Sequence, residues 1–236
     1  MPDIRIDVPG VGSLSAYFSP ARGGDEPAPG VVVVHEAFGL NDDIRRLADE
    51  FAARGFHAVA PDLLSHGPRL TCLVSVMRAL RAGEGRAFAD VAGARGWLTD
   101  RDDCTGRVGI AGFCLGGAFA ILMANRGFDA SAAQYGMLPR RLDGAVAGAC
   151  PVVASYGGRD RSLPGAAARL DAALTAAGVD HDVKEYPEAG HSFMNRSEPP
   201  AWMRPLTTSL HAGYVDTAAT DAWDRISRLF DSALRG

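Results

Sequence analysis

The sequence predicts an α/β fold, in which a mostly parallel central sheet carries helices on both faces. Strand-like and helix-like segments alternate from about residue 30 to the end of the chain, which is typical of parallel sheets. The four consecutive valines from Val31 to Val34 suit a strand covered on both faces. The length of 236 residues, 47% of them hydrophobic, is enough for a single domain over 1–236 with a large core.

Ten elements follow from the pattern. We expect strands at 31–35, 57–60, 107–111, 152–156 and 182–186, and helices at 41–54, 86–99, 115–126, 165–177 and 218–234. In the first helix Ile44, Leu47 and Phe51 recur on one face, Asn41 can cap its start and Gly55 can end it. Residues 62–85 and 195–217 are less regular and are expected to form lid or pocket segments.

Composition excludes several classes of protein. A net charge of −4 does not suit a nucleic-acid binder, and no apolar run is long enough to span a membrane. The N-terminus carries early acidic residues and no apolar leader, so we expect a cytoplasmic protein. The four cysteines are scattered, which favours free thiols over a zinc site or a disulfide framework; they are Cys72, Cys104, Cys114 and Cys150. No cofactor or metal is expected, and the chain is expected to be a monomer or a small homo-oligomer.

The strongest motif surrounds Cys114. The segment Gly112-Phe113-Cys114-Leu115-Gly116 directly follows a predicted strand and opens a predicted helix, which matches the nucleophile elbow with cysteine as the nucleophile. Flanking glycines let the backbone make this sharp turn. The helix N-terminus favours a thiolate and offers free N–H groups to an oxyanion. The alternative is a tightly packed glycine-rich turn that holds an inert cysteine.

A histidine and an aspartate follow at suitable places. His191 comes after the last predicted strand, on a loop from which a general base can reach the nucleophile; His35 is a rival. Asp160 follows the strand at 152–156 and could orient the imidazole, or it could cap the next helix. The order nucleophile, acid, base along the chain is that of α/β-hydrolases.

Glu36 ends the first core strand and therefore faces the same sheet edge as Cys114. The backbone N–H of Ala37 could pair with that of Leu115 to form an oxyanion hole. A solvated loop charge is an equally good interpretation of Glu36.

Taken together, these segments resemble the dienelactone hydrolase family (carboxymethylenebutenolidases). The shared segments are VVVVHEAFGL, HAVAPDLL, GFCLGG, YGGRD and EYPEAGHSF, which span about residues 30–194 in the family's order. The resemblance implies an α/β-hydrolase fold and a triad of Cys114, Asp160 and His191. It also implies that Glu36 hydrogen-bonds the resting thiol and moves when substrate binds, so that the thiolate can form.

The residues that would select the substrate depart from the family's pattern. Members acting on dienelactone hold its carboxylate with arginines, one of them four residues after the histidine, where this chain has Asn195. Arg196 is one residue further on. The substrate-binding candidates are therefore Phe38, Arg81 and Arg196, with Arg78 beside Arg81 on the presumed lid.

The leading hypothesis is an enzyme that hydrolyses a small ester or lactone through a thioester acyl-enzyme. An acyl transferase or thioesterase of the same fold is a second possibility. The third is a ligand-binding relative without turnover, against which the presence of Cys, Asp and His together argues.

Overall fold

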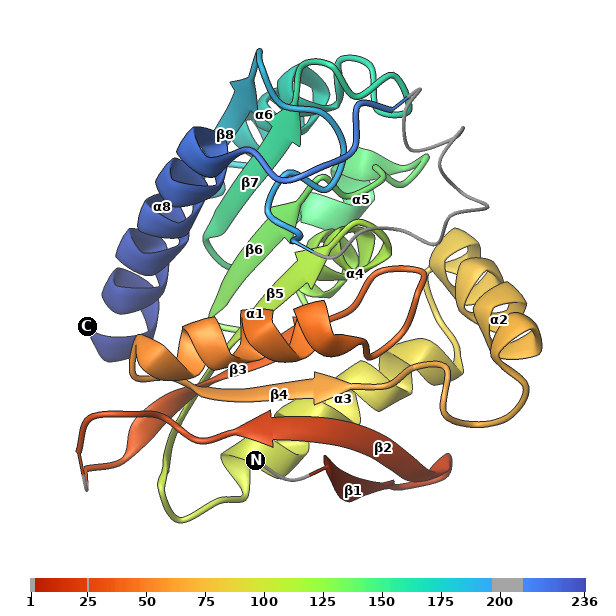
Figure 1. Ribbon diagram of the computed structural model, residues 1–236, viewed down its shortest axis with the longest axis vertical. Helices are drawn as coiled ribbons and strands as arrows, with labels where there is room; N and C mark the ends of the chain where they lie inside the picture. The colour runs from red at the N-terminus through yellow and green to blue at the C-terminus, as the bar shows by residue number, and fades with distance from the viewer. Residues whose placement is uncertain (1–2, 25, 197–209) are drawn as a thin grey trace.

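The computed structural model describes residues 3–24, 26–196 and 210–236, and its described strands form one eight-stranded sheet with helices on both sides (Figure 1). The strands are β1 (Asp3–Val8), β2 (Gly12–Ser19), β3 (Ala28–Val34), β4 (His57–Pro61), β5 (Cys104–Phe113), β6 (Ala130–Gln134), β7 (Val152–Gly157) and β8 (His181–Tyr186). The helices are α1 (Asp42–Ala53), α2 (Arg69–Ala82), α3 (Arg86–Thr99), α4 (Leu115–Met123), α5 (Leu142–Val146), α6 (Ala166–Ala176) and α8 (Asp216–Arg235).

The sheet is mostly parallel. Its strand order is β1-β2-β4-β3-β5-β6-β7-β8. The pairings from β4 through β8 are parallel, and β2 joins β4 and β1 in antiparallel register. The carboxyl ends of β3, β5, β7 and β8 therefore meet at one edge of the sheet, where ligands bind in open α/β folds.

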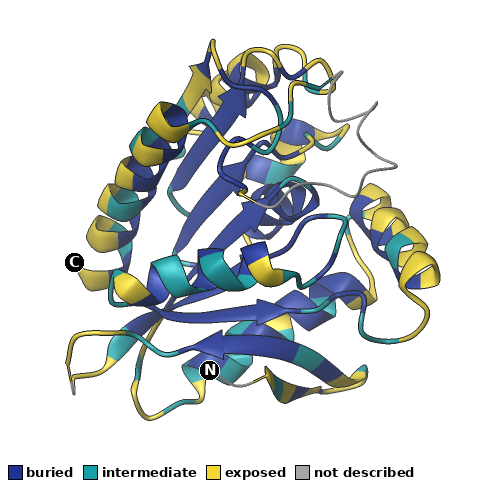
Figure 2. Ribbon diagram, viewed as in Figure 1, coloured by how far each residue is buried: buried dark blue, intermediate teal, exposed yellow. Residues whose placement is uncertain are grey.

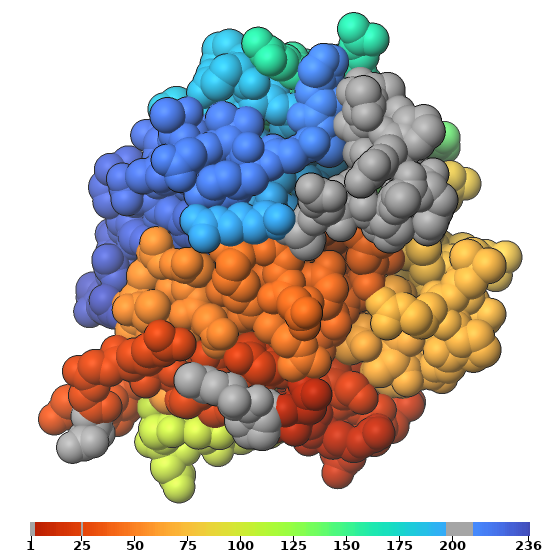
Figure 3. Space-filling view, in the orientation of Figure 1, coloured from red at the N-terminus to blue at the C-terminus, as the bar shows by residue number. Residues whose placement is uncertain are grey.

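A buried core lies on each face of the sheet. Helices α1 and α8 pack on one face, and α2 to α6 pack on the other. Successive residues of β5 alternate between the two cores, with Ile110 on the side of α3 and Ala111 on the side of α1. Figure 2 shows the central strands buried over most of their length, with exposure on the outer faces of the helices, on the loops and on the edge strands β1 and β8. In Figure 3, α1 and α8 lie next to each other over the central strands. Phe51 of α1 packs against Trp223 of α8, with the two ring centroids 4.9 Å apart.

The structure confirms the predicted fold class, and each of the ten predicted elements overlaps an observed one. The expected cap is present, since the side chain of Asn41 accepts a hydrogen bond from the N–H of Ile44 at 2.9 Å. Gly55 follows α1 with φ of +82°, a conformation that glycine adopts without strain.

Two predictions about local structure need correction. Residues 62–85 are not irregular, because 69–82 form the helix α2. The amphipathic pattern of α2 is weak because large apolar side chains are exposed on it, with 75% of the surface of Leu70 and 43% of that of Val74 exposed. The second correction is β6, a buried strand that the sequence did not reveal. Of the segment 195–217, residues 197–209 lie outside the described part of the chain.

Candidate functional site

Cys114 sits at the tip of a strained turn between β5 and α4. Its φ is +55° and its ψ −111°. Residues with a side chain rarely adopt this backbone conformation because it is strained, and such strain is found most often at functional sites. A Cβ on Gly112 would overlap the carbonyl of Gly116, and one on Gly116 would overlap that of Val34. The glycines are therefore required because α4 starts in contact with the ends of β3 and β5.

His191 and Asp160 meet Cys114 at this turn. The Nδ1 of His191 lies 2.5 Å from Oδ2 of Asp160, and the imidazole also hydrogen-bonds the Cys114 side chain. Burial opposes a charge on the ring, but the hydrogen bonds with Asp160 and Cys114 outweigh it and raise the pKa of His191 to about 10. The geometry therefore favours a protonated imidazole beside sulfur.

Asp160 is held by its own turn as well as by the histidine. Its Oδ1 accepts hydrogen bonds from the N–H of Ser162 at 2.9 Å and from its hydroxyl at 2.6 Å. Burial would raise the pKa of Asp160, but these bonds and the one with His191 lower it below its ordinary value. Asp160 is thus an ionised acceptor with a fixed orientation. A serine two residues after an aspartate is typical of such a turn, so the sequence could have predicted this contact.

Glu36 is buried, with 5% of its surface exposed, and it lies close to His191. Its Oε1 accepts a hydrogen bond from the Ser192 hydroxyl at 3.0 Å. Burial raises the pKa of Glu36 to about 7, against the opposing effects of Ser192 and His191. The family resemblance implied a hydrogen bond between Glu36 and the thiol. In the described structure the carboxyl bonds Ser192 instead, and Cys114 pairs with His191.

His35 fixes the peptide that follows Glu36. It is fully buried, its Nδ1 lies 2.5 Å from the Glu36 carbonyl oxygen, and its Nε2 accepts the N–H of Leu63 at 3.0 Å. This pattern requires the proton on Nδ1. Burial lowers the pKa of His35, so the ring is neutral and serves as a brace. That role removes His35 as a rival to His191.

The two N–H groups expected to bind an oxyanion are free of other partners within the described residues. The N–H of Leu115 lies in the first turn of α4, where no intrahelical acceptor exists. The N–H of Ala37 makes no described hydrogen bond either, and it belongs to the same peptide unit as the Glu36 carbonyl that His35 holds. Both groups lie at the carboxyl edge of β3 and β5.

Tyr135 packs next to His191. It is fully buried with φ of +40°, and its ring centroid lies 5.4 Å from that of His191. The Tyr135 hydroxyl donates to Oδ1 of Asn195, the residue that stands where the family's arginine would. Nothing in the sequence signalled this pair, because it joins two segments that are 60 residues apart.

The substrate-binding candidates are not gathered around Cys114 in the same way. Phe38 is half-buried on the loop after β3, and its carbonyl accepts a hydrogen bond from Arg69 at the start of α2. Arg196 is exposed and contacts Tyr214, with its guanidinium 4.8 Å from that ring. No described contact joins Arg196 to Cys114. Arg81 lies on α2, on the wall of a groove beside α4.

Neither a metal site nor a membrane span is found where the structure is described. No group of three or more His, Cys, Asp and Glu side chains there could hold a metal ion. None of the described helices combines the length and the apolar character needed to cross a bilayer.

Comparison with known proteins identifies the family. The model of the dienelactone hydrolase family matches residues 15–234. The chain belongs to this family. It is 31% identical to the carboxymethylenebutenolidase of Pseudomonas putida, over 88% of this chain and 86% of that one.

Solved structures agree with this assignment. A dienelactone hydrolase-like promiscuous phosphotriesterase from metagenomic libraries superposes with a TM-score of 0.78 at 27% identity, and 98% of each chain is covered. The dienelactone hydrolase of Anabaena variabilis shares the fold with a TM-score of 0.72 at 21% identity, over 99% of this chain and 98% of that one. The chain is thus a hydrolase of a family that acts on small esters and lactones.

Proposed function

We propose that the protein hydrolyses a small carboxylic ester or lactone through a thioester acyl-enzyme, with Cys114 as nucleophile, His191 as general base and acid, and Asp160 as its orienting carboxylate. The observation that carries the proposal is the continuous path of hydrogen bonds from Asp160 through His191 to Cys114. The strained turn at Cys114 adds support, because a merely structural cysteine has no need of a positive φ.

The reaction divides into two halves. The Cys114 thiolate attacks the carbonyl carbon, and the carbonyl electron pair moves to oxygen. The tetrahedral intermediate collapses, its carbon–oxygen bond to the alcohol breaks, and the imidazolium of His191 protonates the departing oxygen. Water then attacks the thioester while neutral His191 accepts its proton. Collapse of the second intermediate releases the acid and regenerates the thiolate.

The developing oxyanion needs donors that are already in place. The N–H groups of Leu115 and Ala37 fill that role in the proposal, and His35 is the positioning residue that holds the Ala37 peptide. Removal of a single such donor in other hydrolases costs about 10²–10³ in kcat.

A panel of esters and lactones that includes dienelactone tests the proposal, with mass spectrometry of the quenched protein. Turnover together with an acyl adduct on Cys114 is expected. A protein that binds panel members but never hydrolyses them or forms an adduct is the ligand-binding relative. Transfer of the acyl group to an added alcohol or thiol in preference to water indicates the acyl transferase.

Glu36→Gln should change how the reactivity of Cys114 depends on pH. Since the pKa of Glu36 is raised to about 7, its negative charge is present above pH 7 and absent well below it. That charge disfavours a nearby thiolate. The ratio of iodoacetamide labelling rates, Glu36→Gln over wild type, is therefore expected to rise from about 1 at pH 5.5 to about 3–10 at pH 8.5. A ratio independent of pH would remove Glu36 from control of the thiol.

His35→Leu should lower kcat for an activated ester by about tenfold or more, because the Ala37 peptide loses its brace. His35→Gln can both donate to Glu36 and accept from Leu63, so it should recover most of the rate. Labelling of Cys114 by iodoacetamide reports the thiolate and not the oxyanion, and it should change little in either variant. Equal kcat in the leucine and glutamine variants would rule out the positioning role.

A further inference from the structure

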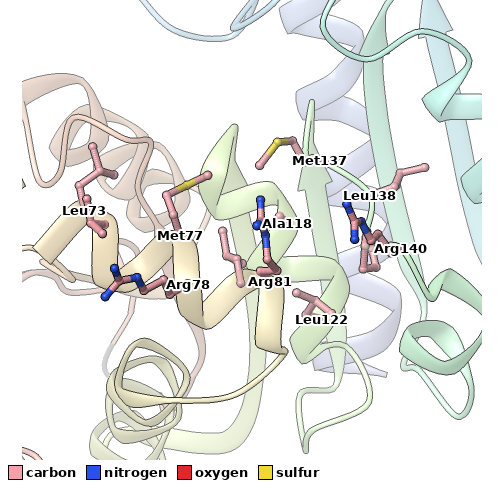
Figure 4. A pocket seen from close by; sticks show the side chains of 12 residues that line it. Leu73, Met77, Arg78, Arg81, Ala118, Leu122, Met137, Leu138 and Arg140 are labelled. Carbon is pink, nitrogen blue, oxygen red and sulfur yellow. The ribbon is translucent and has the colours of Figure 1, made fainter.

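A groove of about 660 Å³ runs beside α4, between α2 and residues 137–140. Its apolar lining includes Leu73, Met77, Ala118, Leu122, Met137 and Leu138. Figure 4 shows Met77 and Met137 reaching toward each other from the two walls, with Ala118 and Leu122 on the floor. Met77 and Met137 are 41% and 45% exposed, so a ligand between them would remove apolar surface from water.

The floor of the groove belongs to the helix that Cys114 caps. Ala118 is one helical turn beyond Cys114 and Leu122 is two turns beyond. At a rise of about 1.5 Å per residue, the part of α4 that lines the groove lies about 6 to 12 Å along the helix from Cys114. Cys114 itself is not among the lining residues, so a chain attached to its sulfur would pass the first turn of α4 before it enters the groove.

The position of His191 relative to Cys114 decides whether the acyl part or the alcohol part of an ester would lie in the groove. His191 follows β8 and must protonate the departing alcohol, so the alcohol leaves on that side. In Figure 1, α4 lies between α2 and the β7–β8 side of the sheet. With the alcohol on the His191 side, the space beside α4 and α2 remains for the acyl part.

Three arginines border the same groove. Arg78, Arg81 and Arg140 line it and are exposed, and none of them has an ion pair or hydrogen bond with a residue that the structure describes. Elsewhere on the described surface some arginines are paired, as Arg101 is with Asp103, and others, such as Arg228, are not. What distinguishes these three is that they share one groove. Figure 4 shows the Arg81 side chain in the middle of the groove beside Ala118, and that of Arg140 on the opposite wall.

We propose that this groove binds the acyl arm of the substrate, an extended apolar chain that ends in an anionic group. The inference rests on the proposed function, since it places the arm relative to Cys114. It narrows the substrate class to amphiphilic esters that are longer than a simple lactone.

Chain length and terminal charge can be varied separately. The test compares kcat/KM for p-nitrophenyl acetate, p-nitrophenyl decanoate and the mono-p-nitrophenyl ester of decanedioic acid, all below their micellar concentrations. Since each fully buried methylene is worth a factor of about four, decanoate should exceed acetate by about 100-fold or more. The decanedioate ester should exceed decanoate by about 3- to 10-fold at low salt, and added salt should reduce that advantage.

Matched variants locate the effect. Arg81→Gln should abolish most of the preference for decanedioate over decanoate, while Arg228→Gln, which changes an exposed arginine on α8, should leave it unchanged. Met77→Asp should lower the ratio of decanoate to acetate by about tenfold or more. Leu70→Asp alters the same helix outside the groove and should leave that ratio as it is.

A direct binding measurement separates this inference from the hydrolytic function. Calorimetry with the Cys114→Ala protein uses decanoate and decyl phosphate, which also distinguishes a carboxylate from a phosphate terminus. Saturable binding that Arg81→Gln weakens would support the groove even if no ester were hydrolysed. Two results would overturn the proposal whether or not short esters are turned over. One is equal kcat/KM for p-nitrophenyl acetate and p-nitrophenyl decanoate, and the other is no binding of decanoate or decyl phosphate.

Discussion

His191→Ala is expected to lower kcat/KM for an activated ester by about four orders of magnitude, because the same ring must hold the proton of Cys114 and return it to the leaving group. Cys114→Ser should cause a comparable loss, since a serine hydroxyl is far less acidic than a thiol and the site stabilises sulfur. Steady-state kinetics with a p-nitrophenyl ester at several pH values measure both effects.

A second histidine supplies the control for that experiment. His181 begins β8 at the opposite end of the strand and bonds the Val179 carbonyl, so His181→Ala should retain wild-type kinetics. Combining His191→Ala with Cys114→Ser should cost little more than either change alone, because the two groups act as a unit. Near-wild-type activity in either single variant, or losses that multiply in the double variant, would refute the assignment.

Gly116→Ala is expected to destabilise the protein strongly. The added methyl group would overlap the carbonyl of Val34 at the end of β3, and main-chain atoms in a central strand cannot yield as a side chain can. We expect a loss of about 3 kcal/mol or more in the free energy of unfolding. Urea denaturation followed by circular dichroism provides the measurement, and failure to obtain folded protein would be the extreme form of the same result.

A glycine elsewhere makes a matched control. Gly96 lies within α3, and a Cβ there would meet nothing within 4 Å. Gly96→Ala should therefore stabilise the protein by about 0.5–1 kcal/mol, as expected for a glycine replaced inside a helix. Equal stability changes at the two positions would show that the close approach of α4 to β3 is not what requires Gly116.

The sequence was most informative where local pattern and local structure coincide. The valine run of β3 and the amphipathic face of α1 predict their own structure. The glycines around Cys114 indicate the sharp turn, although their close contacts with β3 and β6 are visible only in the structure. β6 remained hidden because its sequence, Ala-Ser-Ala-Ala-Gln, has little preference for a strand. Its small residues are explained only by contact, since Ser131 donates to the Ala120 carbonyl of α4 at 2.9 Å.

The parts of the site that escaped prediction are contacts between distant segments. Glu36 and Ser192 are 156 positions apart, and no pattern in one sequence reports such a pair. The brace formed by His35 was missed for a related reason, since its partners are the main-chain groups of Glu36 and Leu63. A single sequence indicates which residue types are available, but the tertiary contacts decide which protonation state each one adopts.

The backbone around Cys114 is packed so closely that its glycines leave no room for a side chain. Gly112, Gly116 and Gly117 each lie against main-chain atoms of a neighbouring segment, so a side chain at any of them would displace the turn that holds the sulfur. If the groove binds the acyl arm, changes of specificity are expected in α2 and the 137–140 segment, whose exposed side chains line it. Laboratory evolution toward new substrate specificities should therefore randomise α2 and residues 137–140 and leave the turn at 112–117 unchanged.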